Sequence, residues 1–308
     1  MPRPHPYREL TTFTAPDGTV YPFHVPSNLG RWVLSQPDWG TPVIDYLTDS
    51  GPAQSGATVR DFFLRPRTVQ LLIRQNFCDR EDYWSGRAAL LNAIRPNRQL
   101  TPTGVLPGRL TRYLPNGDKR ALDVYISDGP RFEGAEIGQW QEHSFQEVLR
   151  FTAYNPVVYD PTAQSTAFIP DAQLVFPITF PITFGSLAAT TNVTYPGTWQ
   201  EYPVFVVTGP VTGLIITNLT TGESITLNYA VPAGVSVTID LSYGAKTVID
   251  SLGNNLIGSV SPASDLGTWH LAPDPEAPGG VNQIEVTGTG VSGASSVVMS
   301  WYSRYFGI

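Results

Sequence analysis

The sequence has little of the chemistry on which enzymes and metal proteins depend. It contains one cysteine, Cys78, so no intrachain disulfide and no cysteine-based metal site can form. Free cysteines are among the most buried residue types, so we expect Cys78 to fill a core rather than to act as a nucleophile. The four histidines, His5, His24, His143 and His270, are scattered, and none has the spacing of a zinc ligand set.

Catalytic and cofactor motifs are also missing. The chain has no G-x-S-x-G nucleophile elbow, no P-loop and no dinucleotide-binding fingerprint after a strand. Acids such as Glu201, Asp250 and Asp265 would form a hydrolytic pair only across a shared cleft, and most acids are solvated surface groups. We therefore expect no catalytic residue, no cofactor and no metal.

Long apolar runs and, in one half, basic residues are scarce. No apolar run approaches the ~20 residues of a membrane span, and the N-terminal MPRPHPYREL has no apolar signal segment.

The two halves of the chain differ in charge. Residues 161–308 hold only Lys246 and Arg304 against nine acidic residues, which gives 2 − 9 = −7, whereas residues 1–160 hold 17 residues of each sign. Neither half has the basic stripe of a sequence-reading DNA binder. The second half should expose a neutral polar surface suited to proteins or sugars.

Apolar residues and chain-breaking residues are plentiful. Of the 308 residues, 41% are hydrophobic, and Gly and Pro number 28 each. The length favours two domains, and the apolar content is enough for two cores. Dense Gly and Pro disfavour long helices and favour short strands joined by turns.

The first half reads as strands with one helix. Asp79 is a plausible N-cap for a helix that ends before Pro96, and Trp84, Ala88, Leu91 and Ile94 form an apolar stripe along it. An Asn-Gly pair at 116–117 between two alternating runs predicts a hairpin. The expected strands are 58–64, 68–74, 108–113, 120–126 and 144–154.

The second half reads as a β-sandwich without a helix. Residues 160–170 lack an apolar period and resemble a linker. The tract FPITFPITF at 176–184 places Phe and Ile on one face and Pro and Thr on the other, which predicts an edge strand. Further strands separated by turn clusters are expected at 204–209, 213–218, 223–227, 235–240, 246–249, 281–287 and 296–302.

Two groups of side chains are candidates for contacts. Arg60, Arg65, Arg67 and Arg74 form the densest basic cluster, which could contact nucleic acid or a protein partner. Protection of a strand edge and salt bridges between subunits explain the cluster more simply. Trp199, Trp269 and Trp301 could stack on sugars, although a Trp of a sandwich is more often in the core. Trp269 and His270 lie in a loop-like stretch before Pro273, so they are the best candidates for contact with carbohydrate or a partner.

These segments in this order resemble the distal tail proteins of siphophages, over nearly the whole chain. The matching stretches are residues 83–96, 151–156, 157–159, 201–205, 208–210, 218–222, 237–240 and 305–308. Residues 1–50 are less typical of the family.

The resemblance implies a fold and a structural role. Residues 1–160 would be a β-rich, split-barrel-like, ring-forming domain with a helix at about 79–95, residues 161–172 a linker, and residues 173–308 a galectin-like β-sandwich. It implies a non-enzymatic homo-hexamer at the virion tail tip, assembled in the host bacterial cytoplasm and not inserted in a membrane. Its partners would be the tail tube protein, the tail-tip protein, the tape measure protein and receptor-binding proteins, and DNA would pass through its channel.

Two other functions remain open from the sequence alone. One is a carbohydrate-binding or receptor-adhesion module on an unrelated scaffold, which sugar retention by the second half would favour. The other is a tail-associated hydrolase, which has no catalytic motif in its favour.

Overall fold

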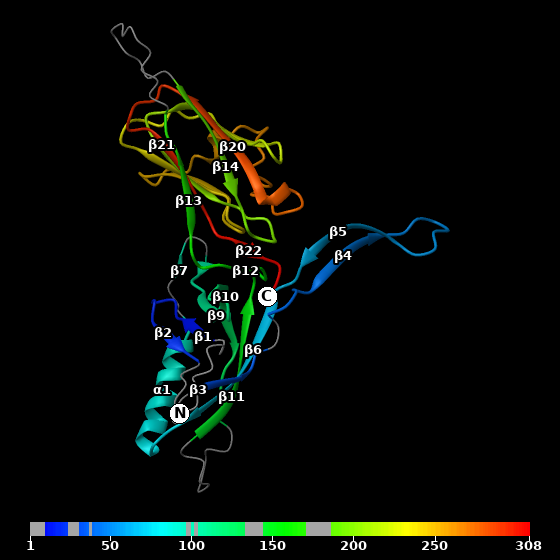
Figure 1. The fold of residues 1–308 in the computed structure, drawn as a ribbon, viewed down its shortest axis with the longest axis vertical. Helices are drawn as coiled ribbons and strands as arrows, with labels where there is room; N and C mark the ends of the chain where they lie inside the picture. The colour runs from blue at the N-terminus through cyan, green and yellow to red at the C-terminus, as the bar shows by residue number, and fades with distance from the viewer. Residues whose placement is uncertain are drawn as a thin grey trace. The chain divides into compact units, whose positions relative to one another are not determined.

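The computed structural model describes residues 10–23, 31–36, 39–96, 100–101, 104–132, 144–170 and 186–308. The chain divides into two compact units, one of Met1–Pro161 with Tyr305–Ile308 and the other of Thr162–Arg304. Both are built from antiparallel strands, and α1 is the one α-helix in the described part of the chain (Figure 1). The expected mainly β class is confirmed.

The first unit contains one main sheet and two small hairpins. Its strands follow the order β2-β1-β9-β10-β11-β6-β3, and β12 pairs with β10. Outside it, β4 pairs with β5 and β7 with β8. The bounds are β1 (Thr11–Thr14), β2 (Val20–Pro22), β3 (Arg31–Ser35), β4 (Ile44–Asp49), β5 (Thr58–Leu64), β6 (Arg67–Asn76), β7 (Leu100–Thr101), β8 (Gly104–Val105), β9 (Gly108–Tyr113), β10 (Lys119–Asp128), β11 (Ser144–Ala153) and β12 (Val158–Tyr159).

The core of the first unit follows the two-residue period of its strands. Along β6, Val69, Leu71 and Ile73 are buried and alternate with more exposed residues. Leu71 pairs directly with Leu149 of β11, which is also fully buried. The hairpin expected at Asn116-Gly117 is confirmed, because β9 and β10 pair on either side of it.

α1 (Arg80–Ile94) begins as the sequence predicts. Asp79 is extended and accepts a hydrogen bond of 2.8 Å from the backbone N–H of Asp82. The acids Glu81 and Asp82 lie in the first turn, where the helix dipole favours negative charge. Among the described residues, Pro96 directly follows the Arg95 C-cap.

The apolar stripe predicted from helical spacing is not the buried face of α1. The buried residues are Tyr83, Leu90, Ala93 and Ile94. Of the predicted stripe only Ile94 is among them; Trp84 and Leu91 are 49% and 43% exposed, and Ala88 is exposed. The helix therefore has two apolar faces, and the one carrying Tyr83 and Leu90 packs on the sheet.

The end of the chain belongs to the first unit. The Tyr305 ring lies 3.8 Å from the guanidinium carbon of Arg120 and packs against the core of this unit. The backbone N–H of Ile308 donates to the carbonyl of Trp39 at 3.0 Å, and a Cβ on Gly307 would lie 2.8 Å from the carbonyl oxygen of Gly40. The chain thus passes from one unit to the other twice, at 161–162 and at 304–305.

The second unit is a sandwich of two sheets around one core. One sheet has the order β13-β21-β15-β18-β19 and the other β14-β20-β16-β17. Side chains of both sheets meet in one cluster, among them Phe205 and Met299 from the first and Ile216 and Ile284 from the second. The bounds are β13 (Gln164–Phe168), β14 (Ser186–Thr194), β15 (Val204–Thr208), β16 (Thr212–Asn218), β17 (Glu223–Leu227), β18 (Ser236–Asp240), β19 (Thr247–Asp250), β20 (Val281–Thr289) and β21 (Ser296–Trp301). The short β22 (Arg304–Tyr305) belongs to neither of these sheets and spans the point where the chain returns to the first unit.

Two expectations about this unit have different outcomes. The strand expected at 296–302 is confirmed as β21, an internal strand between β13 and β15 with Trp301 in the core.

The expectation of irregular structure at 160–170 is wrong for Gln164–Phe168. This segment forms strand β13, which pairs residue by residue with β21. A mostly polar edge strand shows no apolar period, so sequence pattern missed it. The tract at 176–184 lies outside the described residues.

Candidate functional site

The most exposed apolar feature of the first unit is the hairpin of residues 44–64, here called the arm. Figure 1 shows β4 and β5 running out of the unit as a pair, away from α1. All but the last residue of β5 are exposed. Strands of this length reach about 20 Å. Val43, at the base of the arm, and four large apolar residues on it, Tyr46, Leu47, Val59 and Phe63, are more than half exposed.

Strand register sorts the arm's side chains into two faces. Tyr46 lies opposite Phe62, Ile44 opposite Leu64 and Thr48 opposite Val59. Directly opposed residues point to the same side, so Ile44, Tyr46, Val59, Phe62 and Leu64 form one surface, here called the apolar arm face.

The other face of the arm is mixed. It carries Phe63 and Leu47 beside Asp45 and Asp61. Arg65 forms an ion pair with Asp45. A further pair, 3.4 Å long, joins Arg60 and Asp49. Arg60 on the arm and Arg65 directly after it therefore both have carboxylate partners on the hairpin.

Within the described residues, the two strands of the arm contact mainly each other. An isolated two-stranded hairpin is marginally stable in water, and a hairpin that exposes aromatic residues needs a surface to cover them. Among the described strands, none pairs with the outer edge of β4 or of β5. In the described part of the first unit it is the best candidate for an assembly contact.

A second exposed apolar surface lies on α1. Trp84, Ala88 and Leu91 fall at i, i+4 and i+7 and form the helix stripe. The Arg87 guanidinium lies 5.0 Å from the Trp84 ring centroid and 4.0 Å from that of Phe132, which holds both aromatic side chains in place.

The arginine cluster predicted from the sequence is dispersed in the structure. Arg60 lies on the arm and Arg65 directly follows it, whereas Arg67 is 5% exposed and donates to the Phe306 carbonyl at 3.4 Å. Arg65 and Arg67 do not share a strand, because β5 ends at Leu64 and β6 begins at Arg67. The structure thus provides no single basic patch from these residues.

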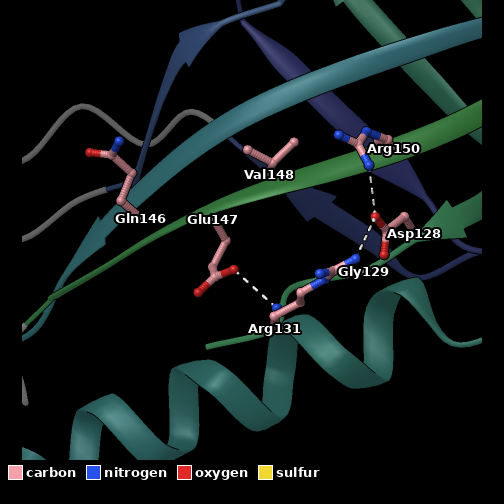
Figure 2. Close-up of a pocket in the computed structure, with 7 residues that line it drawn as sticks. All are labelled: Asp128, Gly129, Arg131, Gln146, Glu147, Val148 and Arg150. Carbon is pink, nitrogen blue, oxygen red and sulfur yellow. Dashed lines mark hydrogen bonds and ion pairs between the residues drawn. The ribbon is translucent and has the colours of Figure 1, made fainter. Parts of the chain in front are cut away.

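A pocket of about 330 Å³ opens at the end of β10 and along β11 (Figure 2). Asp128 accepts from Arg150 at 2.9 Å and lies 3.7 Å from the Arg131 guanidinium, and Glu147 accepts from the backbone N–H of Arg131 at 3.1 Å. Two arginines and two acids give no net charge, and none of the lining residues is a nucleophile. The pocket has the make-up of a surface ion-pair network.

Trp269 and His270 are not at the surface. Trp269 is fully buried, with its ring edge-on to Phe205 at 5.1 Å between centroids, and His270 is 9% exposed. The expectation of an exposed loop is wrong here, because the backbone next to them bridges to Glu201 through Leu271 and draws the loop into the core. Trp269 therefore presents no face for a sugar in this structure.

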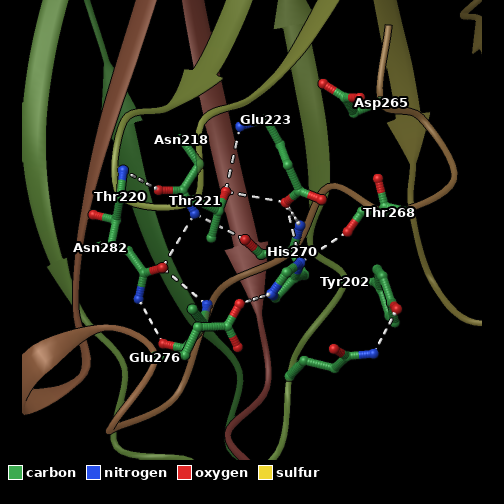
Figure 3. Close-up of polar contacts among 12 residues, drawn as sticks. Tyr202, Asn218, Thr220, Thr221, Glu223, Asp265, Thr268, His270, Glu276 and Asn282 are labelled. Carbon is green, nitrogen blue, oxygen red and sulfur yellow. Dashed lines mark hydrogen bonds and ion pairs between the residues drawn. The ribbon is translucent and has the colours of Figure 1, made fainter. Parts of the chain in front are cut away.

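His270 belongs to a polar cluster that fixes the 251–280 loop to the sheet of β16 (Figure 3). Its Nδ1 lies 2.8 Å from the Thr268 carbonyl and 3.1 Å from Glu223, and its Nε2 lies 3.1 Å from Glu276. Its carbonyl accepts from the Asn218 side chain at 2.8 Å. Asn218 in turn bonds to the Asn282 side chain, which accepts from Ala272.

The acids considered for hydrolysis serve structural roles. Glu201 is buried and forms an ion pair with Arg304; burial raises its pKa, and the Arg304 charge opposes that shift. Asp250 closes the turn after β19, where hydrogen bonds from the Asn254 side chain and backbone lower its pKa. Asp265 accepts from the backbone N–H of Ser224. None of these faces a second acid across a cleft described by the structure.

Cys78 differs from its prediction, since it is exposed at the start of α1. Desolvation raises the pKa of its thiol, and the Asp82 and Asp79 charges add to this, so the thiol is not activated.

Within the described ranges no three His, Cys, Asp or Glu residues gather as a metal site. No described helix is long and apolar enough to cross a membrane. His5, His24 and His143 lie outside the described residues.

Sequence reasoning missed both exposed surfaces as sites. The arm could have been suspected from VRDFFL at 59–64, where three apolar residues follow each other and break the alternation of a half-buried strand. The sequence does show the apolar spacing of the helix stripe. Whether that stripe is exposed depends on which of the two apolar faces of α1 packs on the sheet.

Comparisons with known proteins identify the fold. No protein-family model and no curated protein matches the sequence. Among solved structures, the Dit protein (gp 19.1) of phage SPP1, described as a paradigm of hub adsorption apparatus in phages infecting Gram-positive bacteria, aligns with a TM-score of 0.60 at 10% identity, over 96% of this chain and 99% of that one. A chain of the phage P2 baseplate, in its activated conformation with Ca, aligns with a TM-score of 0.49 at 11% identity, over 95% and 98%. The chain thus has the fold of the SPP1 Dit protein along almost its whole length.

Proposed function

We propose that this chain is a structural, non-enzymatic component of a siphophage tail tip. It acts as a distal tail hub, in which six first units form a closed ring between the tail tube protein and the tail-tip and receptor-binding proteins. DNA passes through the bore. The second unit is a galectin-like sandwich that holds accessory proteins on its charge-poor surface.

The arm is the observation that carries this proposal. It exposes large apolar side chains, among them Tyr46 and Val59, each more than half exposed, and repeated contact with a neighbouring copy would bury them. A contact between two different patches generates a ring when the rotation closes, and closure leaves no exposed ends. The likeness in fold to a hub protein supports the same assignment.

The test is the mass and shape of the purified protein. Six chains of 33.6 kDa give 6 × 33.6, or about 200 kDa, by mass photometry, and negative-stain images should show closed rings. Tyr46→Asp places a charge on the apolar arm face and should shift the mass to that of a monomer. Leu47→Asp is the matched control, since Leu47 is similarly exposed on the other face.

A wild-type protein that stays monomeric, or that grows into open filaments, would contradict the ring. Equal loss of assembly in both variants would show that the apolar arm face is not the specific contact.

A further inference from the structure

We propose that the free edge of β14 docks an extended segment of a partner protein, which adds to the sheet as a further strand and places a basic side chain beside Glu285. This inference rests on the proposed function and deepens it, because it names where the second unit would hold an accessory protein. Two observations carry it: a long edge strand without protection, and a carboxylate next to that edge that has no partner among the described residues.

The edge strand β14 lacks the features that usually protect the edge of a sheet. It ends the sheet β14-β20-β16-β17 (Figure 1), and its register with β20 runs without a bulge over nine residue pairs. It contains no proline and no charged residue, whereas proteins commonly use charges, prolines or bulges to prevent pairing at an edge. Leu187 and Val193 are buried in the core, so the edge is held in place as a template for another strand.

Hydrogen bonds show which backbone groups of β14 face the free edge. The Tyr195 N–H donates to the Gly280 carbonyl at 2.8 Å, which continues the ladder with β20 just beyond the last residue of β14. Bonded and non-bonded pairs alternate along an antiparallel ladder, so every second residue of β14 directs its N–H and C=O away from β20. The Gln283 carbonyl, opposite Asn192, accepts from Leu219 of β16, as this alternation requires. The outward-directed residues, to whose backbone groups no described residue bonds, are Ser186, Ala188, Thr190, Asn192 and Thr194.

The carboxylate beside this edge defines the chemistry of the partner. Glu285 of β20 lies between Thr190 of β14 and Thr217 of β16 in the register of the sheet. It is the one charged side chain among the outward-facing residues of these four strands, and no described residue forms an ion pair with it. Because Thr190 is small, a lysine or arginine opposite it on an added strand can reach across to Glu285. The excess of acidic residues in 161–308 also favours a basic segment.

Strand addition takes its affinity from main-chain hydrogen bonds and its specificity from side chains, so both are tested. The probe is a displayed library of random peptides of about twelve residues, long enough to pair along all of β14. The library is selected on the full-length wild type and counter-selected on Thr190→Pro. Proline at this position removes an N–H that faces the free edge but no bond to β20, and edge strands tolerate it.

The affinities of the selected peptides are then compared among three variants. Asn192→Pro removes a second outward N–H and should weaken binding at least about tenfold. Glu285→Gln should weaken it about two- to fivefold, the effect of one partly exposed ion pair. Thr226→Lys is the matched control, because it changes the charge of the same sheet face by the same amount on β17, at the opposite edge, and should leave binding unchanged.

Hydrogen exchange at single-residue resolution locates the bound peptide. The amides of Thr190 and Asn192 face the free edge and should exchange more slowly when the peptide is bound. The amides of Thr191 and Val193 already belong to the ladder with β20 and should not change. This alternation along one strand distinguishes strand addition from a general tightening of the second unit.

The outcomes separate this inference from the hub function. A library without binders, or selected peptides that bind Asn192→Pro or Glu285→Gln as tightly as the wild type, would overturn the docking site. A wild-type assembly of twice the ring mass that Thr190→Pro reduces to one ring would assign the edge to a second copy and overturn it as well. A ring of about 200 kDa in the same preparations would leave the hub function intact in either case.

Discussion

Replacing Trp301 by alanine tests the assignment of β21 to the sandwich core. Trp301 is 7% exposed, ends an internal strand and pairs with Gln164 of β13. A tryptophan buries about 150–250 Å², which at about 25 cal/mol per Å² corresponds to about 4–6 kcal/mol as an upper bound. Truncations of buried Phe and Trp to Ala cost about 3–5 kcal/mol, and we expect this range for Trp301→Ala.

This loss is a large share of the 5–15 kcal/mol that typically stabilises a domain. Native-state hydrogen exchange on the full chain measures it strand by strand. The opening free energies of amides in β15 and β21 should fall by about 3–5 kcal/mol, while those of β6 and β11 in the first unit stay unchanged.

Trp84→Ala is the matched control for the same truncation. Trp84 is half exposed on α1, so we expect a loss of about 1 kcal/mol or less. Unchanged exchange in β15 and β21 of the Trp301→Ala protein would refute the burial argument and would indicate that Trp301 contacts a partner instead.

Two further predictions concern the turn after β19 and the end of the chain. Hydrogen bonds hold the pKa of Asp250 below its ordinary value, so its contribution to stability is present above that value and is lost as the pH falls through the folded-state pKa. The urea midpoint of Asp250→Asn should therefore lie below that of the wild type at about pH 7 and approach it at about pH 3; a constant difference would contradict this reasoning. Tyr305→Ala removes the ring that stacks on Arg120, and it should raise amide exchange in β9 and β10 of the first unit; faster exchange confined to the second unit would show that the chain end does not stabilise the first.

The local sequence pattern was sufficient to predict the positions of most of the strands and of the helix. The predicted segment 223–227 coincides with β17, and 108–113 coincides with β9, because turn residues bound each alternating run. The Asp79 cap could be predicted because capping depends on residues three apart in the sequence.

The candidate sites could not be predicted in the same way, because exposure depends on contacts between distant segments. Trp269 has the flanking sequence of a loop residue, but the bridge between Glu201 and Leu271 buries it. Trp84 has the spacing of a core residue, but Tyr83 and Leu90 occupy the face toward the sheet. Nothing within the β13 segment marks it as a strand, since its partner β21 lies more than 120 residues further along the chain.

The balanced charges of the first half explain why an assembly contact there would be apolar. Several of its arginines have an acidic partner in their own unit: Arg65 with Asp45, Arg150 with Asp128, and Arg109 with Asp123. Charges satisfied in this way have little to gain from a partner, because exposed ion pairs contribute only about 0–1 kcal/mol. The unit leaves large apolar side chains exposed, and the arm carries several of them, among them Tyr46, Val59 and Phe63. A contact made by the arm would therefore take its free energy mainly from the burial of apolar area.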